Sequence, residues 1–143
     1  MNLLNLKLPR TATAQRLLGK RDRLFAELRA LWAAHDATPA EVEVAFVDEP
    51  AMQALHYDYL HDSSSTDIIT FDLGVSPEGV RLGALYICAE VAQRFAARYK
   101  VPVRQEVQRL LAHGILHLLG YDDHSPQDKR RMRREENKIL ARL

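Results

Sequence analysis

The segment of residues 113–124, HGILHLLGYDDH, restricts the fold more than any other part of the chain. Its apolar residues continue a helical pattern that begins at Pro102, where the missing N–H of proline costs little. Gly120 stands where a glycine can end the helix in a left-handed conformation. His113 and His117 are four residues apart, so their side chains lie on the same helical face. The sequence therefore predicts a helix from Pro102 to the residue before Gly120 that carries two neighbouring imidazoles.

Two imidazoles at this spacing can bind one zinc ion, as in the H-x-x-x-H core of zinc hydrolases. Asp123 and His124 follow the helix at a distance from which either can supply a third ligand. Three protein ligands leave the fourth position of zinc for water, which is typical of catalytic sites. We expect one Zn²⁺ at the C-terminal end of the helix. The expected metal ligands are His113, His117, Asp123 and His124, the last two as alternatives, and the expected catalytic residues are His113 and His117. The other interpretation is a histidine pair that only interacts favourably with the helix dipole.

Gly114 lies between the two histidines, in the middle of the predicted helix. A glycine there destabilises a helix by about 0.5–1 kcal/mol relative to alanine. Its presence indicates that a substrate or another element of the fold approaches the backbone closely. It also means that the chain lacks the glutamate of the H-E-x-x-H motif, which is the usual general base of zinc peptidases. The glycine therefore argues against a metallopeptidase, which the ligand spacing alone would allow.

Apolar periodicity and turn residues predict the other elements. The predicted strands are residues 2–8, 41–47, 68–73 and 83–88. The predicted helices are residues 11–35, with Thr11 or Thr13 as the cap, 48–60, 89–99, 102–119 and 126–142. This order predicts an α+β fold, in which a small mixed β-sheet of about four strands packs with about five helices.

A chain of 143 residues is expected to form one domain, residues 1–143, around a single core. Apolar residues make up 47% and charged residues 27%, as in ordinary soluble proteins. No apolar run approaches the roughly 18 residues that span a bilayer, and the first residues do not resemble a signal peptide. Cys88 is the only cysteine, so no internal disulfide can form. We therefore expect a cytoplasmic protein that does not bind membranes.

Charge is unevenly distributed along the chain, although the net charge is only +1. Residues 1–35 carry a net charge of +5, residues 36–90 of −10 and residues 91–143 of +6. If both ends of the chain fold onto one side, the protein has a basic face that suits a phosphate backbone. The basic residues of the last predicted helix include Lys129, Arg130, Arg131, Arg133 and Arg134. They indicate either phosphate binding or an ordinary helix surface on which Glu135 and Glu136 form ion pairs with them.

Three segments resemble a known family. HGILHLLGYD (residues 113–122) is similar to the H-G-x-L-H-L-x-G-Y-D-H signature of the YbeY family of rRNA maturation factors. STDIITF (residues 65–71) and LGALYIC (residues 82–88) resemble two strands of the same family. Their order and spacing also fit, so the resemblance covers roughly residues 40–140.

The resemblance implies a metal-dependent endoribonuclease that is specific for single strands. Members of the family act in the maturation of ribosomal RNA, especially at the 3′ end of the small-subunit RNA, and in ribosome quality control. The implied partners are therefore single-stranded RNA, ribosomal RNA and the small ribosomal subunit.

The chain departs from the family pattern at four positions. Asp123 stands where the family has its third histidine, and His124 would need a one-residue bulge in the loop to take its place. Leu60 replaces the arginine of a Tyr-Arg pair, Ala84 replaces an aspartate, and Ser65 replaces a proline. The missing charges motivate an alternative function, a metal-stabilised, ribosome-associated RNA-binding factor with little catalysis.

Four further residues have two interpretations each. Asp122 orients a ligand imidazole, or it is an ordinary turn carboxylate. Asp67 points into a cleft at the expected metal site, or it caps the turn after Ser65. Tyr121 belongs to the core or stacks on the substrate. His61 is a surface residue or contacts phosphate.

Overall fold

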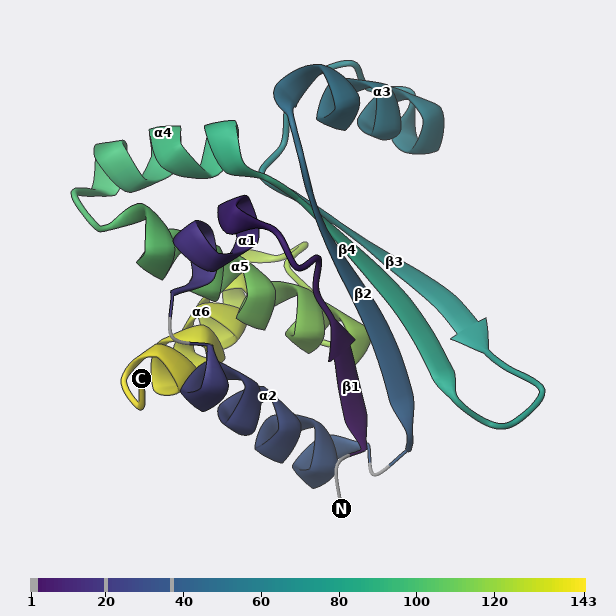
Figure 1. Cartoon of the computed structure of the whole chain (residues 1–143). Coiled ribbons are helices and arrows are strands. Elements are labelled where there is room, and N and C mark those ends of the chain that lie inside the picture. Colours follow the sequence, from purple (N-terminus) through teal and green to yellow (C-terminus); the bar gives the residue numbers. More distant parts are fainter. Residues whose placement is uncertain (1–2, 20, 37) are drawn as a thin grey trace.

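The computed structural model describes residues 3–19, 21–36 and 38–143 (Figure 1). The strands are β1 (Leu4–Lys7), β2 (Ala40–Val47), β3 (Ile68–Val75) and β4 (Arg81–Cys88). The helices are α1 (Ala12–Leu18), α2 (Asp22–His35), α3 (Glu49–Leu60), α4 (Ala89–Tyr99), α5 (Val103–Leu118) and α6 (Pro126–Leu140). None of the described helices combines the length and the apolar character that crossing a membrane requires. Asn2, in the predicted strand of residues 2–8, lies outside the described residues.

The four strands form one mixed sheet in the order β1-β2-β4-β3. β1, β2 and β4 run parallel, and β3 pairs antiparallel with β4. The loop of residues 76–80 joins β3 and β4 into a hairpin, so that β3 is an outer strand. The predicted α+β fold with a small mixed sheet of four strands is confirmed.

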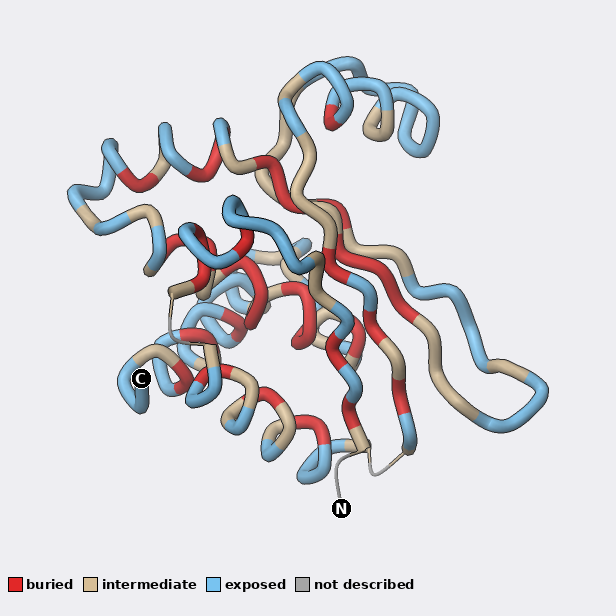
Figure 2. The backbone as a smooth tube through the Cα atoms, in the orientation of Figure 1, coloured by how far each residue is buried: buried red, intermediate tan, exposed pale blue. Residues whose placement is uncertain are grey.

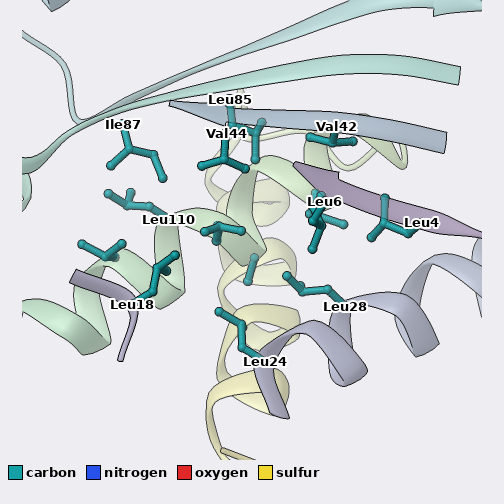
Figure 3. Packing of buried hydrophobic residues seen from close by; sticks show 14 of the residues in the cluster. Leu4, Leu6, Leu18, Leu24, Leu28, Val42, Val44, Leu85, Ile87 and Leu110 are labelled. Atoms are coloured by element: carbon teal, nitrogen blue, oxygen red, sulfur yellow. The ribbon is translucent and has the colours of Figure 1, made fainter. Parts of the chain in front are cut away.

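Helix α5 lies at the centre of the molecule and contacts the helices α1, α2, α4 and α6 and the strands β3 and β4 (Figure 1). Apolar residues on nearly all sides suit this helix to burial. Side chains of β2 and β4 face Leu110 of α5, and Leu24 and Leu28 of α2 lie on the other side of the core (Figure 3). Figure 2 shows that buried residues lie along α5 and along the strands of the sheet. The helix that carries the two histidines is therefore held from several directions.

The opposite face of the sheet has a smaller apolar cluster under α3. Alternation along β4 turns Leu85 toward α5 and Cys88 away from it. Cys88 packs there with Met52, Ile69 and Val91. Burial raises the pKa of the Cys88 thiol, which keeps the thiol protonated and suits it to packing.

The predicted continuous helix of residues 11–35 is two helices, so this prediction is wrong. Thr11, one of the two predicted caps, accepts a hydrogen bond from the backbone of α1. The break follows at Gly19, which has a φ of +63°. This left-handed backbone conformation favours glycine, and the side chain of Arg104 lies against the position, with Nε 2.3 Å from where a Cβ atom would be. Lys20 lies outside the described residues.

Gly114 faces the sheet where α5 crosses it. A Cβ atom at this position would lie 2.7 Å from Cδ2 and 2.8 Å from Cδ1 of Leu85, and 3.3 Å from Cδ1 of Ile68. These distances are shorter than ordinary van der Waals contacts, so glycine lets the helix approach the strands this closely. The close approach indicated by the sequence is therefore to another element of the fold.

We expect Gly114→Ala to destabilise the protein, because the added methyl group has no space beside Leu85. Overpacking of this kind typically costs about 1–3 kcal/mol, against about 0.5–1 kcal/mol gained from the higher helix propensity of alanine. Thermal unfolding followed by circular dichroism measures the difference. In a Leu85→Val background, which lacks both Cδ atoms, the same substitution should be neutral or stabilising. An equal loss of stability in both backgrounds would contradict the steric explanation.

Candidate metal centre

The C-terminal half of α5 and the loop after it bring three metal-binding side chains together. One ligand atom from each of His113, His117 and Asp123 lies within 4.8 Å of the others. Oδ2 of Asp123 is 3.7 Å from Nε2 of His113 and 3.5 Å from Nε2 of His117. The two imidazole rings are 4.7 Å apart between centroids, at an interplanar angle of 85°. All three side chains are partly exposed, so solvent and substrate can reach them.

Each imidazole is oriented by a hydrogen bond on its other nitrogen. Nδ1 of His113 is 2.8 Å from Oε2 of Glu136, and Nδ1 of His117 is 3.0 Å from the carbonyl oxygen of Tyr121. Because both partners are acceptors, Nδ1 carries a proton and donates, which in the neutral ring leaves the lone pair of Nε2 free. The Nε2 atoms are the ones that face Asp123. Metal-binding histidines have the same arrangement, in which the second nitrogen donates to a carboxylate or a carbonyl group.

Gly120 turns the chain back toward α5, and its φ of +100° agrees with the predicted helix end. The N–H of Gly120 donates to the carbonyl of His117, and the N–H of Tyr121 donates to the carbonyl of Leu116. This pair of bonds is a Schellman motif, which satisfies carbonyl groups in the last turn of a helix. The short loop that follows holds Asp123 beside the imidazoles.

His124 lies apart from the group that contains the two α5 histidines. Its side chain is 86% exposed, and its Nδ1 lies 2.9 Å from Oδ1 of Asp122. The same Asp122 oxygen accepts the N–H of Asp123, so Asp122 is a turn carboxylate and contacts neither imidazole of α5. Asp122, Asp123 and His124 form a second, more exposed group that could hold an ion. Of the two alternatives for the third ligand, the loop brings Asp123 to the histidine pair.

Glu136 is a residue of the site that the sequence analysis missed. It is only 4% exposed, although α6 is rich in charged residues. Its carboxylate bonds to Nδ1 of His113, and its Oε1 is 3.2 Å from Nη1 of Arg109. A buried carboxylate is costly unless it is paired, and these two groups provide the pairing. The spacing of Met132, Glu136 and Ile139 contained the signal, because it places Glu136 in the buried stripe of α6.

A cavity of about 250 Å³ opens beside His113 and Asp123. Asp67 and Glu106 also line it, and burial raises the pKa of both carboxyl groups. The negative charge of Asp67 raises the pKa of Glu106 further, and the positive charge of Arg109 opposes this increase. Asp67 therefore lines the cleft, which is one of its two expected roles. The two carboxyl groups hold their protons to a higher pH than ordinary carboxyl groups do.

A second cavity, of about 490 Å³, lies beside both histidines and is bounded by α5, β3 and the end of α3. His113 and His117 line it together with His124 and Leu60. His61 ends α3 with a φ of +56° and lines neither of these two cavities. The candidate metal centre is therefore open toward two hollows, which share His113.

The three side chains fit a divalent metal ion. Nitrogen and oxygen ligands at about 2.0–2.2 Å from a tetrahedral zinc ion lie about 3.4 Å from one another. The separations of 3.5 and 3.7 Å between Asp123 and the two histidines are close to this value. Tyr121 contributes its carbonyl to the site, and its ring lies under the guanidinium group of Arg131 at 5.4 Å.

We expect Glu136→Gln to weaken metal binding by roughly 10–100-fold, because the amide accepts less strongly from Nδ1 of His113 than the carboxylate does. Titration of the metal-free protein with Zn²⁺ in competition with a chelator measures the affinity. Glu135→Gln is the matched control, because Glu135 lies one residue away and pairs with Lys138. Equal affinities of the two variants would refute the role of Glu136.

Comparison with known proteins identifies the family. The family model described as "Endoribonuclease YbeY" matches residues 13–143. A relative from Anaeromyxobacter sp. is 38% identical over 132 residues, which are 92% of this chain and 66% of the relative. A relative from Halorhodospira halophila is 37% identical over 127 residues, which are 85% of this chain and 82% of the relative. Both relatives are named Endoribonuclease YbeY.

A solved structure has a similar fold. The solution structure of a Thermotoga maritima protein superimposes with a TM-score of 0.63 at 21% sequence identity. The match covers 97% of this chain and 87% of that protein, so the likeness extends over the whole architecture. With a family model matched over residues 13–143 and relatives at 37% and 38% identity, the chain belongs to the YbeY family.

Proposed function

We propose that the protein is a zinc-dependent endoribonuclease specific for single-stranded RNA. Its role in this proposal is the maturation of ribosomal RNA, including the 3′ end of the small-subunit RNA, and ribosome quality control. The observation that carries the proposal is the convergence of His113, His117 and Asp123 in a chain of this family. The proposal also includes one domain over residues 1–143, a cytoplasmic location and the small ribosomal subunit as a partner.

Bound zinc supplies two effects, since it lowers the pKa of a coordinated water to about 7 and polarises a phosphoryl oxygen. His113, His117 and Asp123 hold the ion on the side of α5 that opens to the cavities. Glu136 and the Tyr121 carbonyl fix the two imidazoles. The raised pKa of Asp67, caused mainly by burial, suits this carboxyl group to exchange a proton with the RNA during cleavage.

A metallopeptidase is a poorer fit to the same ligands. The glutamate that serves zinc peptidases would stand at position 114, directly after the first histidine. Gly114 lies against Leu85 and Ile68 with no space for a side chain. The position therefore faces the sheet, and a peptidase would need a general base from elsewhere in the cleft.

An RNA-binding factor with little catalysis is the second candidate, and Leu60 favours it. Leu60 is 61% exposed and lines the cavity beside His117, so the cleft lacks the charge of the arginine in the family pattern. Ala84 has less bearing on the site. Its neighbour Leu85 packs against Gly114 of α5, so alternation along β4 turns Ala84 to the opposite face of the sheet.

We expect Asp123→Ala to lose zinc under conditions in which His124→Ala retains one ion per chain. Loss of a direct ligand should weaken binding by more than the roughly 10–100-fold that removal of an outer partner costs. Elemental analysis after gel filtration, together with chelator competition, measures the stoichiometry and the affinity. The reverse pattern would assign the third ligand to His124. A different metal in the purified protein would contradict the zinc assignment.

We expect the zinc-loaded protein to cleave single-stranded RNA, and we expect His113→Ala and chelator-treated protein to lose this activity. The physical reason is that both treatments remove the activated water and the polarised phosphoryl group. Gel analysis of an end-labelled RNA gives the cleavage rate, and a duplex of the same sequence tests strand specificity. Unchanged cleavage in both controls would exclude the metal mechanism. Tight RNA binding without cleavage by the loaded protein would support the second candidate.

A further inference from the structure

We infer that exposed basic residues of α6 bind the phosphate backbone of single-stranded RNA beside the metal centre. The inference rests on the proposed function and names the surface along which the RNA runs. These residues, which we call the α6 basic strip, are Lys129, Arg130, Arg133 and Arg134. All four side chains belong to exposed residues, and their spacing of three or four residues lets them lie on one side of the helix.

Glu135 and Glu136 of α6 pair mainly with residues outside the strip. Glu136 is buried and bonds to His113 and Arg109, and only Arg133 of the strip lies near it, at 3.7 Å. Glu135 bonds at 3.0 Å to Lys138, which is not a member of the strip. Within the part of the chain that the structure describes, the other three strip residues form no ion pair. The ion pairs of Glu135 and Glu136 therefore leave Lys129, Arg130 and Arg134 available to a phosphate backbone.

The strip is continuous with the metal centre. Lys129 and Arg133 line the cavity that contains His113 and Asp123. The same two residues line a groove of about 680 Å³ together with Arg130 and Arg134. A phosphate chain whose scissile group lies beside the histidines can therefore continue along α6 over exposed basic residues.

Like charges three or four residues apart destabilise a helix, as in the pair Arg130 and Arg134. A polyanion along the helix removes this repulsion and releases counterions from the RNA. Membrane binding fits α6 less well, because a helix that lies on a bilayer inserts an exposed apolar face. The apolar residues Met132 and Ile139 of α6 are buried in the protein core. RNA is therefore the polyanion that the surface favours.

The test compares two triple variants that remove the same charge. The strip variant is Lys129→Ala, Arg130→Ala and Arg134→Ala. The control is Arg10→Ala, Arg16→Ala and Arg23→Ala, at exposed positions that line neither the metal cavity nor the α6 groove. Both are measured with a chelator present, which removes metal ions and so prevents metal-dependent cleavage during the measurement. The probe is a labelled single-stranded RNA oligonucleotide, whose binding is followed by fluorescence anisotropy over a range of salt concentrations.

We expect the strip variant to bind this RNA roughly tenfold or more weakly near 0.1 M salt, and the slope of log K against log[salt] to fall by about 2. The control should keep the slope of the parent. The charge-preserving variant Lys129→Arg, Arg130→Lys and Arg134→Lys should keep it too, because the contact is electrostatic. An unchanged melting temperature of the strip variant, or a higher one, shows that the loss is not caused by unfolding.

Equal losses in the strip variant and the control would overturn the inference, because they would reflect net charge alone. Binding to vesicles with anionic lipids, without binding to the RNA, would overturn it in favour of a membrane. Failure of the proposed function is a separate result: the zinc-loaded protein without substitutions then cleaves no RNA, while the strip variant still shows the smaller salt slope and supports the inference.

Discussion

Helix α5 has to satisfy two opposing requirements, and the rest of the structure follows from them. It packs against the sheet and four other helices, and Gly114 brings its backbone unusually close to Leu85 of β4. The same helix must leave His113 and His117 accessible to an ion. The two requirements are met because the histidines lie at the edge of the buried stripe, toward β3 and α6. A helix fixed on several sides gives the imidazoles a rigid base, which metal binding requires.

The contact between Glu136 and His113 couples the last helix to this site. The buried carboxylate is stable because the imidazole and Arg109 both donate to it, and a neutral side chain of the same shape would leave these donors without a strong acceptor. Metal binding needs the neutral form of His113, in which Nδ1 carries the proton and Nε2 does not. Glu136 selects this tautomer and makes Nε2 more electron-rich. The packing of α6 and the affinity for metal therefore depend on the same hydrogen bond.

Periodicity predicted nearly all helices and strands, because β1 and β2 alternate between apolar and polar residues and α5 is apolar between Pro102 and Gly120. It missed the break at Gly19, where the backbone has a φ of +63°, although this conformation favours glycine. At the site, spacing placed His113 and His117 on one face, but local sequence left the third ligand open between Asp123 and His124. That choice depends on how the Schellman turn directs the loop, which is a property of the folded chain. The high charge of α6 favours a surface position for Glu136, although its place in the stripe of Met132, Glu136 and Ile139 predicts burial.

The charges around the cavity relate Asp123, the candidate third ligand, to the basic residues of α6. A carboxylate ligand at 123 would make a metal centre one unit less positive than an imidazole would, and Asp67 and Glu106 add acidic groups to the cavity. Burial raises the pKa of both groups. Leu60 contributes no charge on the other side of the histidines. Attraction of a polyanion to this centre therefore has to come from outside the ligand set, and Lys129 and Arg133 are the exposed cations that line the same cavity.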